Sequence, residues 1–203
     1  MQLAQWLKTA NMKTKLLILF VIASCRLFAQ NNYFVDKKGT KIIMDNESVR
    51  VILIDKRISY SLVGKTWNKY VKFDDLDYAI VGSSLLKSFN LNNDKKSNVY
   101  FVFGESEDKY LIGAEITYTT TQGNMSYSEM SYNLIVTDKK QMILEDLYFT
   151  SRKKDRENNE SDKVAPLIEK YFSNCPEIMT KLNNHRASIL DFFGDTEYVN
   201  CTK

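Results

Sequence analysis

Apolar and polar residues alternate along residues 109–118 of the chain. One set of alternate positions holds Tyr110, Ile112, Ala114, Ile116 and Tyr118. Side chains of a β-strand point to its two faces in turn, so this period predicts a half-buried strand. Residues 129–137 follow the same rule, with an apolar set of Met130, Tyr132, Leu134 and Val136. We therefore predict a hairpin that turns at residues 122–124.

The same period predicts several shorter strands along the chain. They cover residues 33–35, 40–43, 49–54, 58–63, 71–73, 78–81, 99–103 and 142–149. Short polar segments join them, for example 36–39 and 138–140. Parallel neighbours need longer crossover connections, so the loop lengths favour antiparallel pairing.

The pattern becomes helical after the charged segment 152–160. Apolar residues recur at helical spacing between 164 and 172, and Pro166 lies in the first turn, where its missing N–H is tolerated. Residues 173–175 interrupt this helix, and Pro176 can begin a second one.

These elements together predict an α+β fold. We expect an antiparallel β meander, arranged as a curved sheet, sandwich or open barrel, with two C-terminal helices packed on it. Residues 30–203 are long enough for a single β-rich domain, with a helical tail at about residues 161–193.

Residues 1–29 have the organisation of a secretory signal peptide. Lys13 and Lys15 precede the apolar run 16–23, and Ala29 offers a cleavage site before Gln30. The run is too short to span a bilayer, which needs about 20 apolar residues. Because Met12 also begins a natural leader, residues 1–11 are either an over-extended start or a long first region of the leader.

A second interpretation of the leader is a lipoprotein signal. Residues 22–25, Ile-Ala-Ser-Cys, are similar to the motif in which the cysteine is lipidated and becomes the mature N-terminus. Apolar residues continue beyond Cys25 and Arg26 follows it directly, which favours soluble export. Lipidation at Cys25 would anchor the domain to a membrane; otherwise we expect no membrane partner.

Removing the leader changes the charge of the chain. The full sequence has 28 basic and 25 acidic residues, but residues 1–30 hold four bases and no acid. The remainder therefore has 28 − 4 = 24 bases against 25 acids. This balance argues against nucleic acid as a partner, because phosphate binding needs a concentrated positive surface.

Two cysteines, Cys175 and Cys201, follow the leader. In an oxidising compartment an even number favours a disulfide, which would close a loop of 201 − 175 = 26 residues. Two buried thiols are the alternative. A zinc site is not expected, because two cysteines and His185 leave the four-ligand shell incomplete.

The sequence contains no recognised catalytic pattern. Gly82-Ser83-Ser84 lacks the second glycine of a nucleophile elbow, and no phosphate-binding glycine loop occurs. His185 is the single histidine and is expected to be an exposed linker residue. A pair of catalytic carboxylates has no marker that would select it among the acids. We therefore predict no catalytic residue, cofactor or metal.

Two clusters offer weaker signals. Asp74, Asp75 and Asp77 could supply oxygens to Ca²⁺, but their spacing does not match a calcium loop, and a solvated turn is the favoured interpretation. The hydroxyl- and aromatic-rich segment 118–128 could contact a glycan or a protein, although an ordinary hairpin uses the same residues.

Three segments carry a resemblance to a known group. They are the leader from Met12-Lys13-Thr14-Lys15 to Phe28-Ala29-Gln30, the opening Tyr33-Phe34-Val35-Asp36-Lys37-Lys38-Gly39-Thr40, and the tail Tyr171-Phe172-Ser173-Asn174-Cys175-Pro176-Glu177. The chain resembles small exported proteins of the Bacteroidota, a group with no assigned activity. The resemblance implies export and domain organisation and carries over no catalytic residue.

These observations favour an exported, non-enzymatic binding or interaction domain of the cell envelope. We expect it in the periplasm or outside the cell, with a protein or glycan as its partner. The alternatives are a carrier of a small apolar ligand in a β cavity and a periplasmic hydrolase without a recognised motif.

Overall fold

The computed structural model describes residues 32–122, 125–150, 161–186 and 188–201; for residues 116–122, 125–129 and 161 only the backbone is described. Residues 32–203 form one compact unit. The predicted signal peptide and the lipidation site Cys25 lie outside the described residues. No helix in the described ranges has the length and apolar character needed to cross a bilayer.

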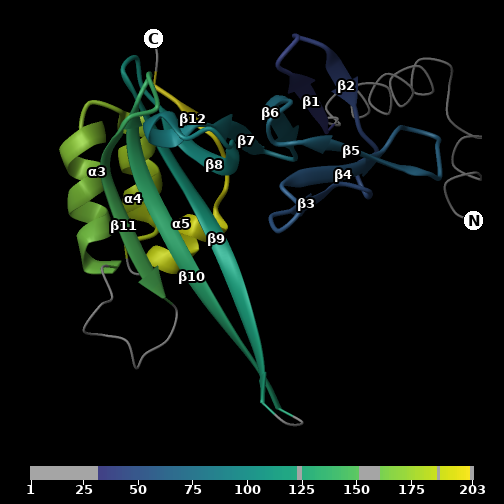
Figure 1. Ribbon diagram of the computed structural model, residues 1–203. Coiled ribbons are helices and arrows are strands. Elements are labelled where there is room, and N and C mark those ends of the chain that lie inside the picture. Colours follow the sequence, from purple (N-terminus) through teal and green to yellow (C-terminus); the bar gives the residue numbers. More distant parts are fainter. Residues whose placement is uncertain (1–31, 123–124, 151–160, 187, 202–203) are drawn as a thin grey trace, which may run out of the picture. The chain divides into compact units, whose positions relative to one another are not determined.

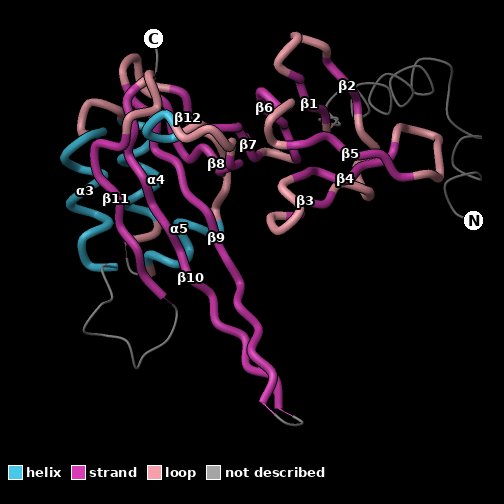
Figure 2. The backbone as a smooth tube through the Cα atoms, in the orientation of Figure 1, coloured by secondary structure: helices cyan, strands magenta, loops and turns pink. Residues whose placement is uncertain are grey.

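Nine of the described strands form one sheet (Figures 1 and 2). Its strand order is β11-β10-β9-β8-β7-β6-β1-β2, and β12 pairs with β8. The strands are β1 (Tyr33–Asp36), β2 (Lys41–Ile43), β6 (Leu76–Val81), β7 (Ser84–Phe89), β8 (Asn98–Glu105), β9 (Lys109–Gln122), β10 (Met125–Asp138), β11 (Ile143–Thr150) and β12 (Val199–Asn200). All neighbours are antiparallel except β12 and β8, which are parallel.

Between β2 and β6 the chain leaves this sheet and forms a second one. This small sheet has the order β3-β4-β5 and consists of β3 (Arg50–Ile52), β4 (Arg57–Ser61) and β5 (Asn68–Lys72). A single bridge between Met44 and Leu62 connects the end of β2 with the end of β4. The small sheet is therefore an excursion from the main sheet that stays in contact with it.

Three α-helices follow the strands, and a short 3₁₀ turn, η3 (Ser161–Lys163), precedes them. They are α3 (Val164–Phe172), α4 (Pro176–Asn184) and α5 (Ile189–Gly194). Pro176 occupies the first turn of α4, and the Sγ atom of Cys175 accepts from the backbone N–H of Ile178. The predicted helical tail thus holds three helices, where two were expected.

One face of the main sheet carries both covering layers. A row of directly opposed residues crosses seven strands from β1 to β11: Phe34, Ala79, Leu86, Phe101, Gly113, Leu134 and Leu147. Its first half packs against the small sheet, and its second half packs against the helices. The two hydrophobic clusters meet at Phe101, which packs against both.

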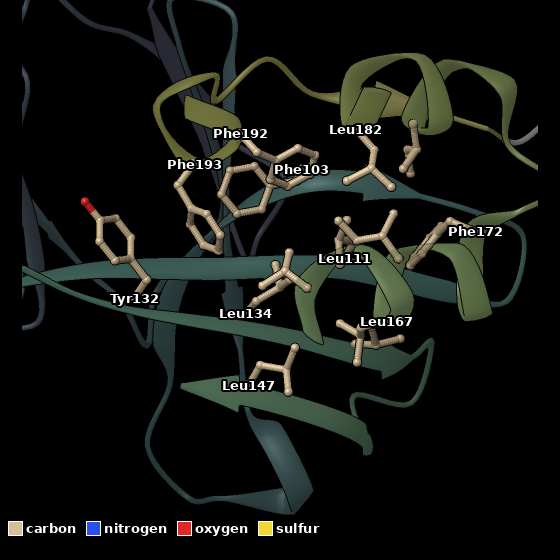
Figure 3. Packing of buried hydrophobic residues seen from close by; sticks show 14 of the residues in the cluster. Phe103, Leu111, Tyr132, Leu134, Leu147, Leu167, Phe172, Leu182, Phe192 and Phe193 are labelled. Atoms are coloured by element: carbon tan, nitrogen blue, oxygen red, sulfur yellow. The ribbon is translucent and has the colours of Figure 1, made fainter. Parts of the chain in front are cut away.

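The cluster under the helices is rich in phenylalanine (Figure 3). The ring of Phe193 lies 5.2 Å from that of Phe103 and 5.1 Å from that of Phe149. Gly113 allows this packing, because a Cβ atom there would lie 2.7 Å from Cε2 of Phe103 and 2.8 Å from the carbonyl oxygen of Asn133. The α5 segment therefore docks over the point in β9 that has no side chain.

The opposite face of the main sheet buries a third cluster. It contains Leu85, Phe89, Val102, Ile112 and Ile135. The 3₁₀ turn η1 (Leu91–Asn93) follows β7 and binds the β10–β11 turn: the N–H of Asn92 donates to the carbonyl of Gln141 at 3.0 Å. The sheet thus curls over its own side chains, and they fill the inside of the curve.

The structure confirms the predicted α+β class, the curved antiparallel sheet and the C-terminal helices. It also contains the predicted disulfide between Cys175 and Cys201, whose Cα atoms are 5.5 Å apart. Two strands were missed, namely β7 and the two-residue β12. The apolar sets of the 109–118 and 129–137 strands lie on opposite faces of the sheet, since Ile112 pairs with Ile135 and Gly113 pairs with Leu134.

Candidate functional site

The three aspartates of the 74–77 segment do not converge on one point. Asp74 accepts from the backbone N–H of Ser97 at 2.9 Å, and Asp77 pairs with Lys87 at 3.4 Å. The backbone hydrogen bond from Ser97 lowers the pKa of Asp74. Among the described residues, no three metal-ligating side chains form a group. The turn interpretation is therefore the one that these contacts support.

His185 is not the exposed linker residue that the sequence predicted. It follows the last residue of α4, is half-buried, and its Nε2 atom lies 3.2 Å from Oδ2 of Asp195. The backbone turns back here towards α5, so the residue is held between two helices.

The structure says less about the other candidates from the sequence. Gly82 makes the β6–β7 turn with φ +60°, and the side chains of segment 118–128 lie outside the described residues.

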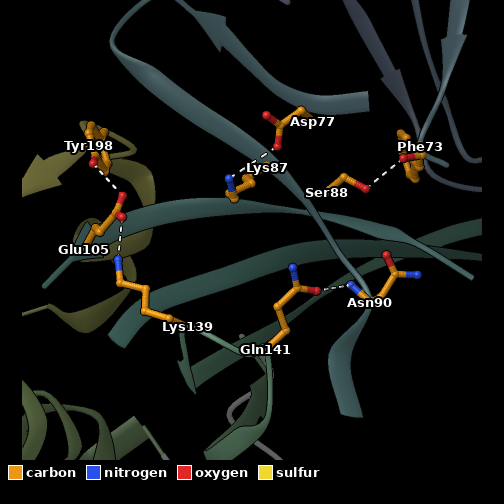
Figure 4. A network of polar contacts seen from close by, with 9 residues as sticks. All are labelled: Phe73, Asp77, Lys87, Ser88, Asn90, Glu105, Lys139, Gln141 and Tyr198. Atoms are coloured by element: carbon orange, nitrogen blue, oxygen red, sulfur yellow. Dashed lines mark hydrogen bonds and ion pairs between the residues drawn. The ribbon is translucent and has the colours of Figure 1, made fainter. Parts of the chain in front are cut away.

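A polar network lies where β8 meets the C-terminal segment (Figure 4). Glu105 accepts from Lys139 and from the hydroxyl of Tyr198, the latter at 2.8 Å. The amine of Lys139 lies 3.9 Å from the ring centre of Tyr110. Burial and Glu105 raise the pKa of Tyr110 to about 12.

The carboxylate and the two phenols of this network keep their ordinary charge states at neutral pH. Burial works to raise the pKa of Glu105, but hydrogen bonds from Lys139 and Tyr198 outweigh it and hold the pKa below its usual value. The carboxylate therefore stays ionised, and the two phenols stay protonated as donors. A general acid or base needs a pKa near the working pH. The members of the network satisfy one another's hydrogen bonds. We assign the network the role of fastening the C-terminal segment to β8.

A second satisfied cluster surrounds Lys181, whose side chain is 6 % exposed. Its amine donates to the carbonyl of Glu197 at 2.8 Å and lies 3.5 Å from Oδ1 of Asp195. Burial lowers the pKa of Lys181, and Asp195 opposes this shift. A buried charge needs such partners to be tolerated at all. The cluster borders a shallow polar hollow of about 390 Å³.

A cleft of different character opens between the β1–β2 turn and the edge of β5. Its volume is about 350 Å³, and its lining comprises Phe34, Asp36, Lys37, Lys38, Ile42, Tyr60, Tyr70, Val71 and Asp75. The rings of Phe34 and Tyr60 meet edge to face at 5.1 Å. Both residues belong to the core beneath the small sheet, with exposures of 2 % and 5 %. The floor of the cleft is therefore aromatic.

The hydroxyl of Tyr60 has no hydrogen-bond partner among the described residues, although the residue is buried. Burial raises the pKa of Tyr60, so the phenol remains a neutral donor. Its oxygen is not one of the fully buried, unpartnered side-chain atoms of the described residues, so the hydroxyl meets solvent. A polar atom that reaches a cleft without a partner is a candidate contact for a ligand.

The rim of the cleft adds both donors and acceptors. Asp36 is occupied: it accepts from the backbone N–H groups of Thr40 and Lys38 at 2.8 and 2.9 Å, and the bond from Thr40 lowers its pKa. Lys37 donates to Ser97 Oγ at 3.3 Å. The amine of Lys38 and the carboxylate of Asp75 form no hydrogen bond or salt bridge with another described side chain, although the charge of Lys38 helps to lower the pKa of Asp36; both residues are exposed. They remain available to a bound molecule.

The other large hollow lies beside the disulfide. It measures about 580 Å³ and is lined mainly by polar residues, including Ser106, Glu107, Asp108 and Asn174. Asp108 there is paired with Lys109 and Ser106, and the bond from Lys109 lowers its pKa. The hydroxyl of the bordering Tyr171 donates to Glu145. Tyr171 and Phe172 also line this hollow, but its surface is mostly polar, whereas that of the Tyr60 cleft is about half apolar; we therefore take the cleft as the candidate site.

Comparison of the chain with protein-family models, with curated proteins and with solved structures gives no match. The function must therefore be argued from the site.

Proposed function

We propose that this protein is an exported, non-enzymatic binding domain of the cell envelope, and that its partner occupies the Tyr60 cleft. The observation that carries the proposal is the aromatic floor that Phe34 and Tyr60 give this cleft, together with a Tyr60 hydroxyl that has no hydrogen-bond partner among the described residues. Ligand sites combine apolar walls with a few well-placed polar groups, and this cleft has both.

The lining indicates the kind of partner. Tyr60 and Tyr70 present aromatic surface, while Tyr60 and Lys38 supply donors and Asp75 supplies acceptors. A glycan, or a peptide segment with neighbouring hydroxyl and carbonyl groups, matches these features. The packed inside of the curved sheet, filled by Phe89, Val102 and Ile112, gives less support to a carrier of an apolar ligand.

The direction of the pKa shifts supports binding over hydrolysis. Hydrogen bonds hold the pKa values of Glu105 and Asp195 below their ordinary values despite burial, and burial raises those of Tyr110 and Tyr198. These shifts move the four groups away from neutral pH; burial lowers the pKa of Lys181, but its amine is held by Glu197 and Asp195. General acid–base chemistry requires the opposite direction.

Export is the second part of the proposal. Its support is the leader-like segment 1–29 together with the Cys175–Cys201 disulfide, which is typical of oxidising compartments. We propose cleavage before Gln30, with lipidation at Cys25 as the alternative, and membership of the exported Bacteroidota group that the chain resembles.

Native mass spectrometry of the exported protein tests the binding site. The protein is incubated with a solubilised envelope extract and compared with Tyr60→Phe, which removes one oxygen atom, and Lys38→Glu. We expect an adduct on the wild type that both variants lose at least in part. Tyr171→Phe is the matched control and should keep the adduct. Equal adducts on all four proteins, or an adduct that is consumed with time, would contradict the proposal.

A further inference from the structure

The small sheet β3–β5 concentrates the positive charge of the chain. Residues 50–72 contain six bases, Arg50, Lys56, Arg57, Lys65, Lys69 and Lys72, and one acid, Asp55. Their formal charge is 6 − 1 = +5, whereas the rest of residues 31–203 has 18 bases and 24 acids, or −6. The nearly neutral total charge of residues 31–203 is therefore the sum of a strongly positive segment and a negative remainder.

Most of this positive charge is unpaired. Arg57 lies 2.8 Å from Asp55. No described carboxylate forms a salt bridge with the other five bases, which are Arg50, Lys56, Lys65, Lys69 and Lys72. An exposed group of like charges attracts an anionic surface over a distance of about 10 Å in ordinary salt.

The same segment exposes large apolar side chains. Six of the twelve exposed large hydrophobic residues in the described part of the chain lie between positions 51 and 70. They are Val51, Leu53, Ile54, Val63, Trp67 and Tyr70. Ile54 is 97 % exposed at the β3–β4 turn, and Val63 and Trp67 are 64 % and 55 % exposed in the β4–β5 loop. Such a concentration is unusual on a surface that meets only water.

The registers place Arg50, Arg57, Tyr70 and Lys72 on the outer side of the small sheet, whereas Lys69 opposes the buried Tyr60 on the other side. Val51, Ile58 and Val71 oppose one another in a row; Ile58 and Val71 are buried in the core. The neighbouring rows, Arg50-Ser59-Tyr70 and Ile52-Arg57-Lys72, therefore face outwards. The guanidinium of Arg57 lies 5.3 Å from the ring of Tyr70, and the amine of Lys69 lies 4.7 Å from that of Trp67.

We propose that the outer face and the two loops of the small sheet dock on an anionic lipid bilayer. Lysine and arginine are attracted to anionic headgroups, while tryptophan and tyrosine favour the membrane–water interface. Exposed aliphatic residues at a loop tip add burial among the acyl chains. A soluble polyanion would account for the bases alone, but it gives no role to Ile54 and Val63.

Vesicle sedimentation with the full exported protein tests the inference. The vesicles are phosphatidylcholine alone, or phosphatidylcholine with phosphatidylglycerol. We expect binding to the anionic vesicles only, and a loss of at least about tenfold for Arg50→Glu/Lys72→Glu, since two charge reversals remove more than about 1.4 kcal/mol. Lys95→Glu/Lys96→Glu is the matched control: it changes the net charge equally, on an exposed turn outside the small sheet.

The apolar contribution is tested with Ile54→Ser and Trp67→Ala, each compared with Leu144→Ser, which alters an exposed residue of β11. We expect the first two to weaken binding severalfold and the third to leave it unchanged. All variants share one N-terminus, so any contribution from residues before 32 cancels. Tyr60→Phe should bind vesicles normally, which separates this inference from the cleft.

Three results would overturn the inference. One is equal binding to neutral and anionic vesicles. Another is an equal loss in the two charge-reversal pairs, which would make the attraction a property of net charge. The third is a loss in Arg50→Glu/Lys72→Glu with full binding by Ile54→Ser and Trp67→Ala, which would indicate a soluble polyanion in place of a bilayer.

Discussion

The amine of Lys181 and the carboxylate of Asp195 face each other at 3.5 Å, one on α4 and the other just after α5. The lysine is almost completely buried, and the rings of Phe103 and Phe192 lie 5.5 and 5.4 Å from its amine. Asp195 in turn accepts from His185. The charge of Lys181, which lies among core phenylalanines, thus depends on one partly exposed counter-charge, the carboxylate of Asp195.

The first prediction concerns this pair. Asp195→Asn removes the counter-charge and leaves a buried ammonium, so we expect a loss of about 1–3 kcal/mol in the free energy of unfolding, measured with urea at pH 7. Lys181→Met keeps the apolar stem without the charge and should cost less. Asp146→Asn, on the exposed side of β11, is the control. Equal stability of Asp195→Asn and wild type would show that the pair has no stabilising role.

The second prediction is a pH dependence that passes through Glu105. Its pKa in the folded protein lies below the ordinary 4.5, because Lys139 and Tyr198 outweigh burial. Its contribution to stability is therefore present above about pH 4.5 and is lost as the pH falls through the folded pKa. Urea unfolding between about pH 7 and 3 should show a steeper fall for wild type than for Glu105→Gln.

Asp195 shares this direction, since its hydrogen bonds hold its pKa below 3.8 against the effect of burial. Some acid sensitivity should therefore remain in Glu105→Gln. The exposed Glu107→Gln is the matched control and should follow the wild type. Identical pH profiles for all three proteins would rule out the Glu105 network as a source of stability.

The third prediction tests the close approach at Gly113. Gly113→Ala places a methyl group within 3 Å of Phe103 and of the Asn133 carbonyl, so the phenylalanine cluster must shift. We expect a loss of about 1–3 kcal/mol, the usual effect of overpacking a core. Gly194→Ala meets nothing within 4 Å and should be nearly neutral. Thermal unfolding followed by circular dichroism compares them; equal melting temperatures would contradict the packing argument.

The fourth prediction concerns the disulfide. It closes a 26-residue loop, so Cys175→Ser/Cys201→Ser should lose about 3–4 kcal/mol in the chain-entropy model. Dithiothreitol should lower the urea midpoint of the wild type to that of the double variant and should not affect the variant itself. A midpoint that dithiothreitol leaves unchanged would mean that the bridge adds no stability.

The sequence predicted the strands that have one buried and one polar face, and it missed β7, which is buried on both faces, and β12, which has only two residues. In β7, Leu85 and Leu86 are both buried although they point to opposite faces, so the hydrophobic alternation disappears. Helix α5 was missed because its six residues are too few to establish a period.

The candidate site could not be predicted from the local pattern of apolar and polar residues. Phe34, Tyr60 and Tyr70 come together through the packing of two sheets, and periodicity along the chain does not determine which strands join which sheet. One signal was present in retrospect: Tyr60 occupies the inward position of the predicted strand 58–63, where a phenol brings a hydroxyl that needs a partner. The positive segment 50–72 was visible in the sequence, but the total charge concealed it.

The parallel pairing of β12 with β8 has a consequence for the order of synthesis. Val199 joins Gly104 at a separation of 199 − 104 = 95 residues, and the disulfide and Tyr198 fasten the same segment. A chain made from its N-terminus reaches residue 105 long before these contacts exist, and closing so long a loop is slow. These contacts therefore form only after residues 198–201 have been synthesised. For a polypeptide that crosses a membrane unfolded, this delay keeps the chain loose during its passage.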